Sequence, residues 1–259
     1  MDIVLDGRRL ESAWWGPKPE DAPTLVLLHE GLGSVGLWRD IPGALAEATG
    51  CGVFAYSRFG YGQSSPAPLP WPMYYMHREA QDVLPRVLDA AGVRRAVMIG
   101  HSDGGSIAAI HAGGTADPRV AGLVLIAAHF FVEDMNIAAI QQIRGTYDQG
   151  DLRVRLARHH RNVDNAFHGW NGAWLDPRFR AFDITGFLPR ITVPVLGLQG
   201  ADDPYGSGAQ LRVLEQTMRA PVTTRLIPDA KHAPHLENRP VTLAAIADFA
   251  RLRLRETTA

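Results

Sequence analysis

The chain has a single cysteine, Cys51, among its 259 residues. One cysteine excludes an intramolecular disulfide, and with it the small secreted scaffolds that depend on disulfide cross-links. Cys51 lies between two glycines at the start of an apolar run. Because free cysteine is usually buried, we interpret it as a small core residue rather than a nucleophile. A lone thiol of this kind suits a reducing compartment.

The sequence also lacks an excess of either charge and any long hydrophobic run. The formal net charge is −1 at pH 7, so we expect neither nucleic acid nor a membrane as a partner. The longest apolar run, residues 120–128, is far shorter than the roughly 20 residues of a membrane-spanning helix. Residues 1–6 show no signal-peptide pattern, and we therefore predict a cytoplasmic protein. Nothing in the sequence indicates the oligomeric state.

Apolar segments typical of strands alternate with segments of helical periodicity. Strands are expected at residues 2–5, 8–15, 24–29, 52–56, 95–99, 120–128, 193–198 and 222–227. This alternation is typical of a mostly parallel sheet that helices cover on both faces. Because 46% of the residues are hydrophobic, the chain can bury one large core.

Between residues 130 and 190 the strand pattern stops and helical patterns take over. We predict that residues 130–190 form a helical cap over one edge of the sheet, and that residues 1–129 and 191–259 form the core. The cap is rich in aromatic residues, which could line a substrate pocket or form a small core of the cap itself. The candidates for substrate contact are Phe130, Phe167, Trp170 and Trp174.

The most specific motif is G-x-S-x-G within the run V-M-I-G-H-S-D-G-G-S at residues 97–106. It joins an apolar strand to a segment with helical character. In that context the motif forms a sharp strand-to-helix turn, which lifts the serine hydroxyl out of the sheet. The flanking glycines tolerate the crowded backbone. We therefore predict that Ser102 is a nucleophile; the alternative is a glycine-rich turn with no catalytic role.

Two later strands are each followed by groups that can activate a serine. Asp202 and Asp203 follow the strand at 193–198, and His232 and His235 follow the last strand. Ligand crevices of parallel sheets form at the carboxyl ends of the strands. The chain order of serine, acid and histidine matches that of hydrolases that use such a turn. The sequence therefore predicts a catalytic triad at this edge.

These features together resemble the α/β-hydrolase family over essentially the whole chain. The matching segments are H-E-G-L-G-S at residues 29–34, G-Y-G-Q-S at 60–64, the G-x-S-x-G turn, G-x-x-D at 200–203, and His232. The resemblance implies an α/β-hydrolase fold with a mostly parallel, eight-stranded sheet and a helical cap inserted between two late strands. It also favours Asp203 over Asp202 as the acid and His232 over His235 as the base.

The resemblance further implies an oxyanion hole made by the backbone N–H groups of Asp103 and Gly31, with Glu30 as the one-residue alternative. Two positions depart from the common family pattern, since Glu30 stands where glycine is frequent and Asp103 where an apolar residue is frequent. Acidic side chains there would oppose the stabilisation of an anion. We hypothesise that Arg58 pairs with Glu30 or Asp103; the alternative is an Arg58 that faces solvent. Glu30 is also a candidate for substrate contact.

The sequence as a whole predicts a serine hydrolase that cleaves a small, largely apolar carboxylic ester or related acyl compound. A triad of Ser102, His232 and Asp203 would act through an acyl-enzyme. We expect no cofactor and no metal, because the triad needs no Lewis acid and the histidines lack metal-binding spacing. The alternatives are a carbon–carbon bond hydrolase of the meta-cleavage type, a lactonase, and a non-catalytic ligand receptor on the same fold.

Overall fold

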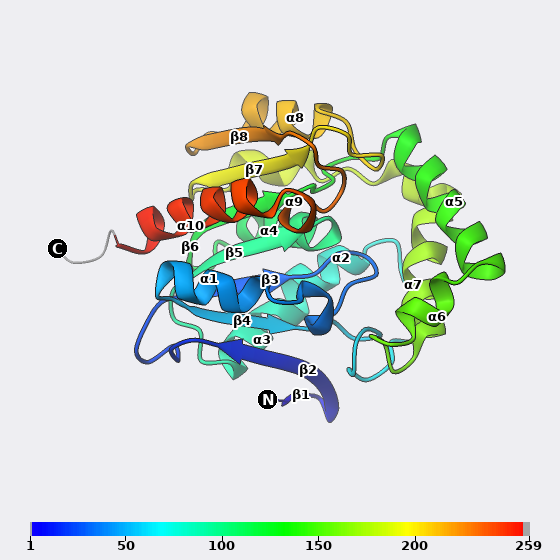
Figure 1. Ribbon diagram of the computed structural model, residues 1–259, viewed down its shortest axis with the longest axis horizontal. Helices are drawn as coiled ribbons and strands as arrows, with labels where there is room; N and C mark the ends of the chain where they lie inside the picture. The colour runs from blue at the N-terminus through cyan, green and yellow to red at the C-terminus, as the bar shows by residue number, and fades with distance from the viewer. Residues whose placement is uncertain (1, 256–259) are drawn as a thin grey trace.

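The computed structural model describes residues 2–255, and it contains one eight-stranded sheet (Figure 1). The strand order is β1-β2-β4-β3-β5-β6-β7-β8. β2 (Arg8–Trp15) runs antiparallel to β1 (Asp2–Leu5) and β4 (Gly52–Tyr56). The remaining pairs are parallel and join β4 with β3 (Thr24–Leu28), β5 (Ala96–His101), β6 (Val120–Ile126), β7 (Val195–Gly200) and β8 (Val222–Ile227). The predicted fold class is confirmed.

Burial explains why unbroken apolar runs form the middle of the sheet. Every residue of β3, β4 and β5 is buried, whereas the edge strand β8 is largely exposed or half-exposed. Strands that are covered on both faces need apolar side chains on both, so alternation appears only at the edges. The same burial fixes the position of the carboxyl end of β5, from which the candidate nucleophile projects.

Helices cover both faces of the sheet, as predicted (Figure 1). One core cluster joins the sheet to α1 (Ile41–Thr49) and α10 (Arg239–Arg255). The other joins it to α3 (Leu84–Ala90), α4 (Asp103–Thr115) and α8 (Ala209–Thr217). Two short helices, η1 (Val35–Trp38) and α9 (Pro234–Glu237), lie in the loops after β3 and β8.

Residues 75–91 have helical periodicity with Pro85 inside it, a pattern that predicts one helix with a kink at the proline. This stretch consists of α2 (Tyr75–Arg78), the π-helical segment η2 (Glu79–Val83) and α3, without an interruption between them. Proline has no N–H and crowds the preceding turn, so the hydrogen-bond ladder must change there. The helix accommodates Pro85 by widening into a π-helical turn just before it.

Three helices of the predicted cap lie beyond the carboxyl ends of the parallel strands (Figure 1). They are α5 (Asp134–Gln149), α6 (Leu152–Leu156) and α7 (Val163–Leu175), followed by η3 (Pro177–Ala181) and η4 (Thr185–Arg190). η4 packs on α4 rather than over the sheet edge, because Gly113 leaves room for Phe187. The domain boundaries at 130 and 190 therefore stay a prediction.

Buried histidines make the free energy of unfolding of this fold depend on pH. Burial is the largest cause that lowers the pKa of His29, His129 and His235, to about 4 for His129. The unfolded chain binds protons below its histidine pKa near 6.5, whereas the folded chain does not until lower pH. We therefore expect the free energy of unfolding to fall as the pH drops from 7 to 5. Each such histidine contributes up to about 1.4 kcal/mol per pH unit.

Urea unfolding at pH 7 and pH 5 checks this expectation. His235→Phe should reduce the difference between the two pH values, because it removes one histidine that stays neutral when folded. His168→Phe is the matched control, since His168 is exposed. Equal stability of the native chain at both pH values would contradict the expectation.

Candidate active site

Ser102 lies on the turn between β5 and α4. Its φ of 51° is in the left-handed region, which non-glycine residues rarely adopt. A Cβ at Gly100 would overlap the backbone of Gly104, and one at Gly104 would overlap the backbone of Leu28. The two glycines of G-x-S-x-G are therefore required by close backbone approach. A strained residue on such a turn indicates a functional position.

His232 and Asp203 face each other from the loops after β8 and β7. His232 Nδ1 lies 2.9 and 3.0 Å from the two carboxylate oxygens of Asp203. Asp203 also accepts hydrogen bonds from the backbone N–H of Tyr205 and from the amide of Gln199. Burial would raise the pKa of Asp203, but the hydrogen bond from His232 lowers it below its usual value. An ionised carboxylate only accepts, so Nδ1 carries the proton and Nε2 is free to act as a base.

The structure also separates the competing candidates. Asp202 is exposed and lies outside this interaction, whereas Asp203 is buried. His235 is buried between Trp38 and His101 instead of lying at the rim of the site. Of the two acid–histidine choices, the structure therefore brings together the pair Asp203 and His232.

One cavity of about 120 Å³ collects most of the predicted site residues, and we call it the serine cavity. From the core it is lined by Ser102, His232, Gly31, Asp103 and Glu30, and from the cap by Trp170, Trp174, Ile140 and Ile143. Ser102, His232, both candidate oxyanion donors and two predicted aromatic contacts therefore line one cavity, and Asp203 contacts His232 from outside the lining. The cap helices close the cavity on the side away from the sheet.

Phe130 and Phe167 do not line the serine cavity, and their expected substrate contact is corrected. Phe167 is fully buried and stacks on Tyr147 of α5, with 3.5 Å between the ring centroids. Phe130 is also buried, and its backbone N–H donates to Gln210. Aromatic residues of the cap thus divide between its own core and the cavity wall, a division that sequence spacing does not encode.

Arg58 pairs with neither acidic side chain near the oxyanion position, contrary to the hypothesis. It is 4% exposed, so the solvent-facing alternative is also wrong. Its guanidinium donates to the backbone oxygens of His29, at 2.5 Å, and Glu30, at 3.0 Å. Arg58 therefore holds the loop before Gly31 through main-chain carbonyls. The sequence indicated a role for this charge but not its partners.

Both acidic side chains have other neighbours. Asp103 accepts hydrogen bonds from the Tyr75 hydroxyl, at 2.5 Å, and from the Trp174 indole, at 3.3 Å. Burial raises the pKa of Asp103, and the charge of Arg58 and these bonds only partly oppose the rise, so the group holds a proton more readily than an exposed aspartate. Glu30 lies 3.5 Å from His101 Nδ1. Burial would raise the pKa of Glu30, but His101 lowers it well below its usual range.

A family model for the alpha/beta hydrolase fold matches residues 23–167, which is more than half of the chain. The chain belongs to the α/β-hydrolase family. No curated protein sequence matches it. Similar solved structures include the proline iminopeptidase of Mycobacterium smegmatis, which is 18% identical to this chain. The two structures match with a TM-score of 0.78, and the alignment covers 100% of this chain and 99% of that chain.

Two further relatives of this α/β hydrolase have different stated activities. The enol-lactonase from Burkholderia xenovorans LB400 is 21% identical, with a TM-score of 0.71 and coverage of 96% of this chain and 99% of that chain. A thermophilic esterase from Thermogutta terrifontis is 18% identical, with a TM-score of 0.73 and coverage of 98% and 97%. At such identities the likeness shows the shared fold alone, so the substrate must be argued from the site.

Four residues around the site of this α/β hydrolase were not among the candidates from the sequence. Tyr75 holds Asp103, His101 Nε2 lies 2.7 Å from the backbone oxygen of His232, and the rings of Tyr205 and His129 lie 4.6 and 5.7 Å from His232. His101 had one available signal, because it directly precedes Ser102. The others come from separate loops and a helix, and no local motif marks them.

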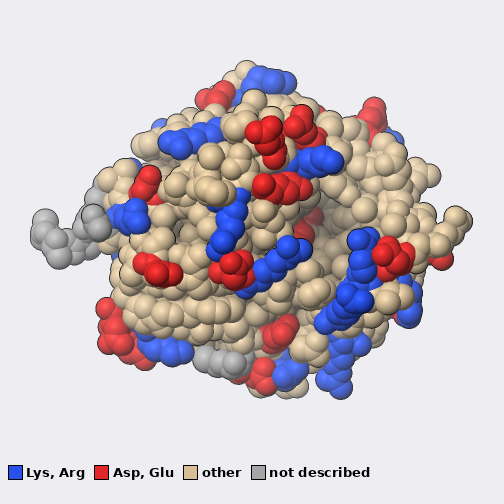
Figure 2. All heavy atoms as spheres, in the orientation of Figure 1, with Lys and Arg blue, Asp and Glu red and all other residues tan. Residues whose placement is uncertain are grey.

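The surface of this α/β hydrolase carries charges of both signs. On the face shown in Figure 2, basic and acidic side chains are largely interspersed. The cap arginines Arg153 and Arg155 pair with Asp164 and Asp151. Within residues 2–255, no helix has the length and apolar character needed to cross a membrane. In the same range, no cluster of three or more metal-ligating side chains is found.

Gly31→Ala is expected to reduce turnover strongly, because a Cβ at this position would overlap the indole of Trp170. Either the loop that carries the candidate oxyanion donor or the indole must move. Removing one oxyanion donor costs about 10²–10³ in turnover, and we expect a loss approaching that range. Gly172→Ala on α7 is the control, since a Cβ there meets nothing within 4 Å. Steady-state kinetics of both variants test this; equal turnover would place Gly31 outside the catalytic machinery.

Proposed function

We propose that this protein is a serine hydrolase that cleaves a small, largely apolar carboxylic ester through an acyl-enzyme. One observation carries the proposal. Ser102, on a strained turn with φ of 51°, shares a cavity with His232, whose Nδ1 lies 2.9 Å from buried Asp203. A serine, an imidazole and an oriented carboxylate are the groups that acyl transfer needs.

In this proposal His232 Nε2 takes the proton of the Ser102 hydroxyl as the oxygen attacks the acyl carbon. The histidine then gives that proton to the leaving alcohol, and the acyl group remains on Ser102. Water, deprotonated by the same nitrogen, releases the carboxylic acid and restores the serine. Asp203 keeps the proton on Nδ1 and stabilises the imidazolium. Because Asp203 is held by Tyr205 and Gln199 as well, its orientation is fixed before substrate arrives.

The tetrahedral intermediate needs donors for its oxygen. We assign this role to the backbone N–H groups of Asp103 and Gly31, which line the same cavity. Asp103 is the first residue of α4, so the positive end of the helix dipole favours an anion there. The Asp103 side chain accepts from Tyr75 and Trp174, and these donors offset its charge.

The cavity indicates the size and polarity of the acyl group. Its volume of about 120 Å³ is below the range of roughly 300–1,000 Å³ for drug-sized ligands. Ile140, Ile143, Trp170 and Trp174 supply apolar walls. These features support a short apolar acyl chain.

Hydrolysis of p-nitrophenyl esters with acyl chains of two to twelve carbons tests the proposal, beside an acyl lactone and a meta-cleavage ring-fission product. We expect kcat/KM to be highest for the shortest chains and to fall as the chain outgrows the cavity. Cleavage of the lactone alone, or of the ring-fission product alone, would replace the ester assignment by the corresponding alternative. No hydrolysis of any compound would favour a receptor.

A further inference from the structure

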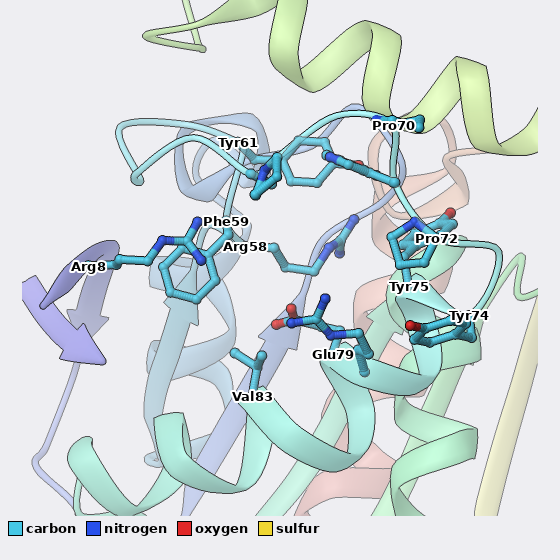
Figure 3. Close-up of a pocket in the computed structure, with 14 residues that line it drawn as sticks. Arg8, Arg58, Phe59, Tyr61, Pro70, Pro72, Tyr74, Tyr75, Glu79 and Val83 are labelled. Carbon is cyan, nitrogen blue, oxygen red and sulfur yellow. The ribbon is translucent and has the colours of Figure 1, made fainter. Parts of the chain in front are cut away.

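A second cavity of about 320 Å³ lies beside the serine cavity, and we call it the arginine cavity (Figure 3). The loop after β4 forms one side of it, α2 and η2 form another, and Arg8 of β2 lies at its edge. Its volume falls within the range of small-molecule sites. No step of the proposed hydrolysis uses it.

Basic groups outnumber acidic ones in the lining of the arginine cavity. Arg8, Arg58 and Arg78 line it, with Glu79 as the acidic residue. Arg58 is buried and forms no ion pair with a carboxylate in the described part of the chain, since its bonds go to backbone oxygens. Burial raises the pKa of Glu79, whose carboxylate accepts a hydrogen bond from Tyr56 at 2.6 Å. The lining therefore favours an anion.

The walls of the arginine cavity are aromatic and proline-rich. Figure 3 shows Phe59 beside Arg8 on one side, Tyr74 and Tyr75 on the other, and Arg58 between them. The indole N–H of Trp71, a further lining residue, is buried and has no hydrogen-bond partner within residues 2–255. A buried donor without a partner is costly, so an acceptor on a ligand would be favoured near this indole.

We propose that the arginine cavity binds a small organic carboxylate with an aromatic or apolar body. The carboxylate meets the guanidinium of Arg58, which has no ion pair with a carboxylate in the described part of the chain, with Arg78 at the opening, and the body packs on the rings and prolines. Charge-assisted hydrogen bonds to arginine are among the stronger polar contacts in proteins. A neutral molecule of the same shape would lose that contribution.

The wall between the two cavities connects such a ligand to the candidate oxyanion hole. Arg58 holds the carbonyls of His29 and Glu30, just before Gly31, and Tyr75 holds Asp103. Each side chain thus lines the arginine cavity and contacts a residue at or next to an expected oxyanion donor. A carboxylate that draws the guanidinium away from these carbonyls loosens the loop and lowers kcat. This effect on turnover rests on the proposed hydrolase function, whereas the binding does not.

Calorimetric titration with phenylacetate and with its neutral analogue phenylacetamide tests the binding. Val83→Trp should fill the cavity and weaken phenylacetate binding at least about tenfold, which is ~1.4 kcal/mol. Arg78 is an exposed residue of the lining. Arg78→Gln should weaken phenylacetate binding about threefold, because one exposed charge is lost. Val154→Trp and Arg225→Gln change exposed residues elsewhere and should leave the dissociation constant unchanged. Phenylacetamide should bind at least about tenfold more weakly than phenylacetate.

Ile143→Trp, which fills the serine cavity, separates the two sites and should not affect phenylacetate binding. Loss of binding in that variant, unchanged binding in both Val83→Trp and Arg78→Gln, or no saturable binding at all would overturn the proposal.

Saturating phenylacetate should also lower kcat of ester hydrolysis in the native chain but not in Val83→Trp. An unchanged kcat would overturn the coupling. Because calorimetry needs no turnover, failure of the hydrolase assignment leaves the binding result interpretable.

Discussion

Ser102→Ala is expected to lower ester turnover by about 10⁶-fold, because loss of the nucleophile in a serine triad removes the covalent step altogether. The fold should be retained. Alanine and serine are equally strained at the positive φ of this position, so the substitution adds no backbone strain. The hydrogen bond from the backbone N–H of residue 102 to the Ile126 oxygen also remains. Steady-state kinetics with the best ester and a urea unfolding curve measure the two effects separately.

Ser106→Ala is the matched control. Ser106 lies one turn along α4, is fully buried, and donates to the backbone oxygen of His129 at 2.6 Å. The same hydroxyl accepts from the His129 N–H at 3.3 Å, so its loss should cost about 1–3 kcal/mol of stability. Turnover should stay within about a hundredfold, because the hydroxyl takes no part in the proposed chemistry. Ser102→Ala with more than a hundredth of native turnover and an unchanged unfolding midpoint would remove Ser102 from the mechanism.

Asp203→Asn is expected to lower kcat by about 10⁴-fold with little change in fold, as in other serine triads. The amide can donate to His232 Nδ1 and thus place the imidazole proton on Nε2, where the base is needed. Asp203 is buried, and in the variant the amide oxygen can keep the bond from the Tyr205 N–H while the bond from Gln199 is lost, because the amide nitrogen cannot accept. A urea unfolding curve of the variant separates the effect of the His232 tautomer on kcat from any loss of stability.

Asp202→Asn is the control for that experiment, because Asp202 is the adjacent exposed carboxylate. Its kcat should stay within about twofold of the native value, as is usual for surface changes away from a site. If Asp202→Asn is the more damaging substitution, the acid has been assigned to the wrong residue. If neither variant loses activity, His232 does not depend on a carboxylate.

The sequence predicted the sheet well, because its evidence is local. Each expected strand lies within two residues of the observed one, since buried parallel strands must be apolar on both faces. That Ser102, Asp203 and His232 lie at the ends of strands could also be predicted, whereas their catalytic roles stay a prediction. Each follows a strand, and parallel topology brings the ends of strands together without further information.

Side-chain partners across the site could not be predicted in the same way. Arg58 was expected to meet a carboxylate, yet it donates to two backbone carbonyls. Tyr75 and Asp103 are 28 positions apart in the chain and meet only because α2 and α4 pack together. The division of the cap aromatics between core and cavity has the same origin, since it depends on how helices face each other.

Reaction with a serine-directed fluorophosphonate, followed by peptide mass spectrometry, tests the central claim most directly. The reagent reports an activated serine whatever the natural substrate is. We predict one adduct per chain, located at Ser102, with complete loss of ester hydrolysis and no adduct in Asp203→Asn on the same time scale. An active enzyme that forms no adduct, or an adduct on another residue that accompanies inactivation, would contradict the account.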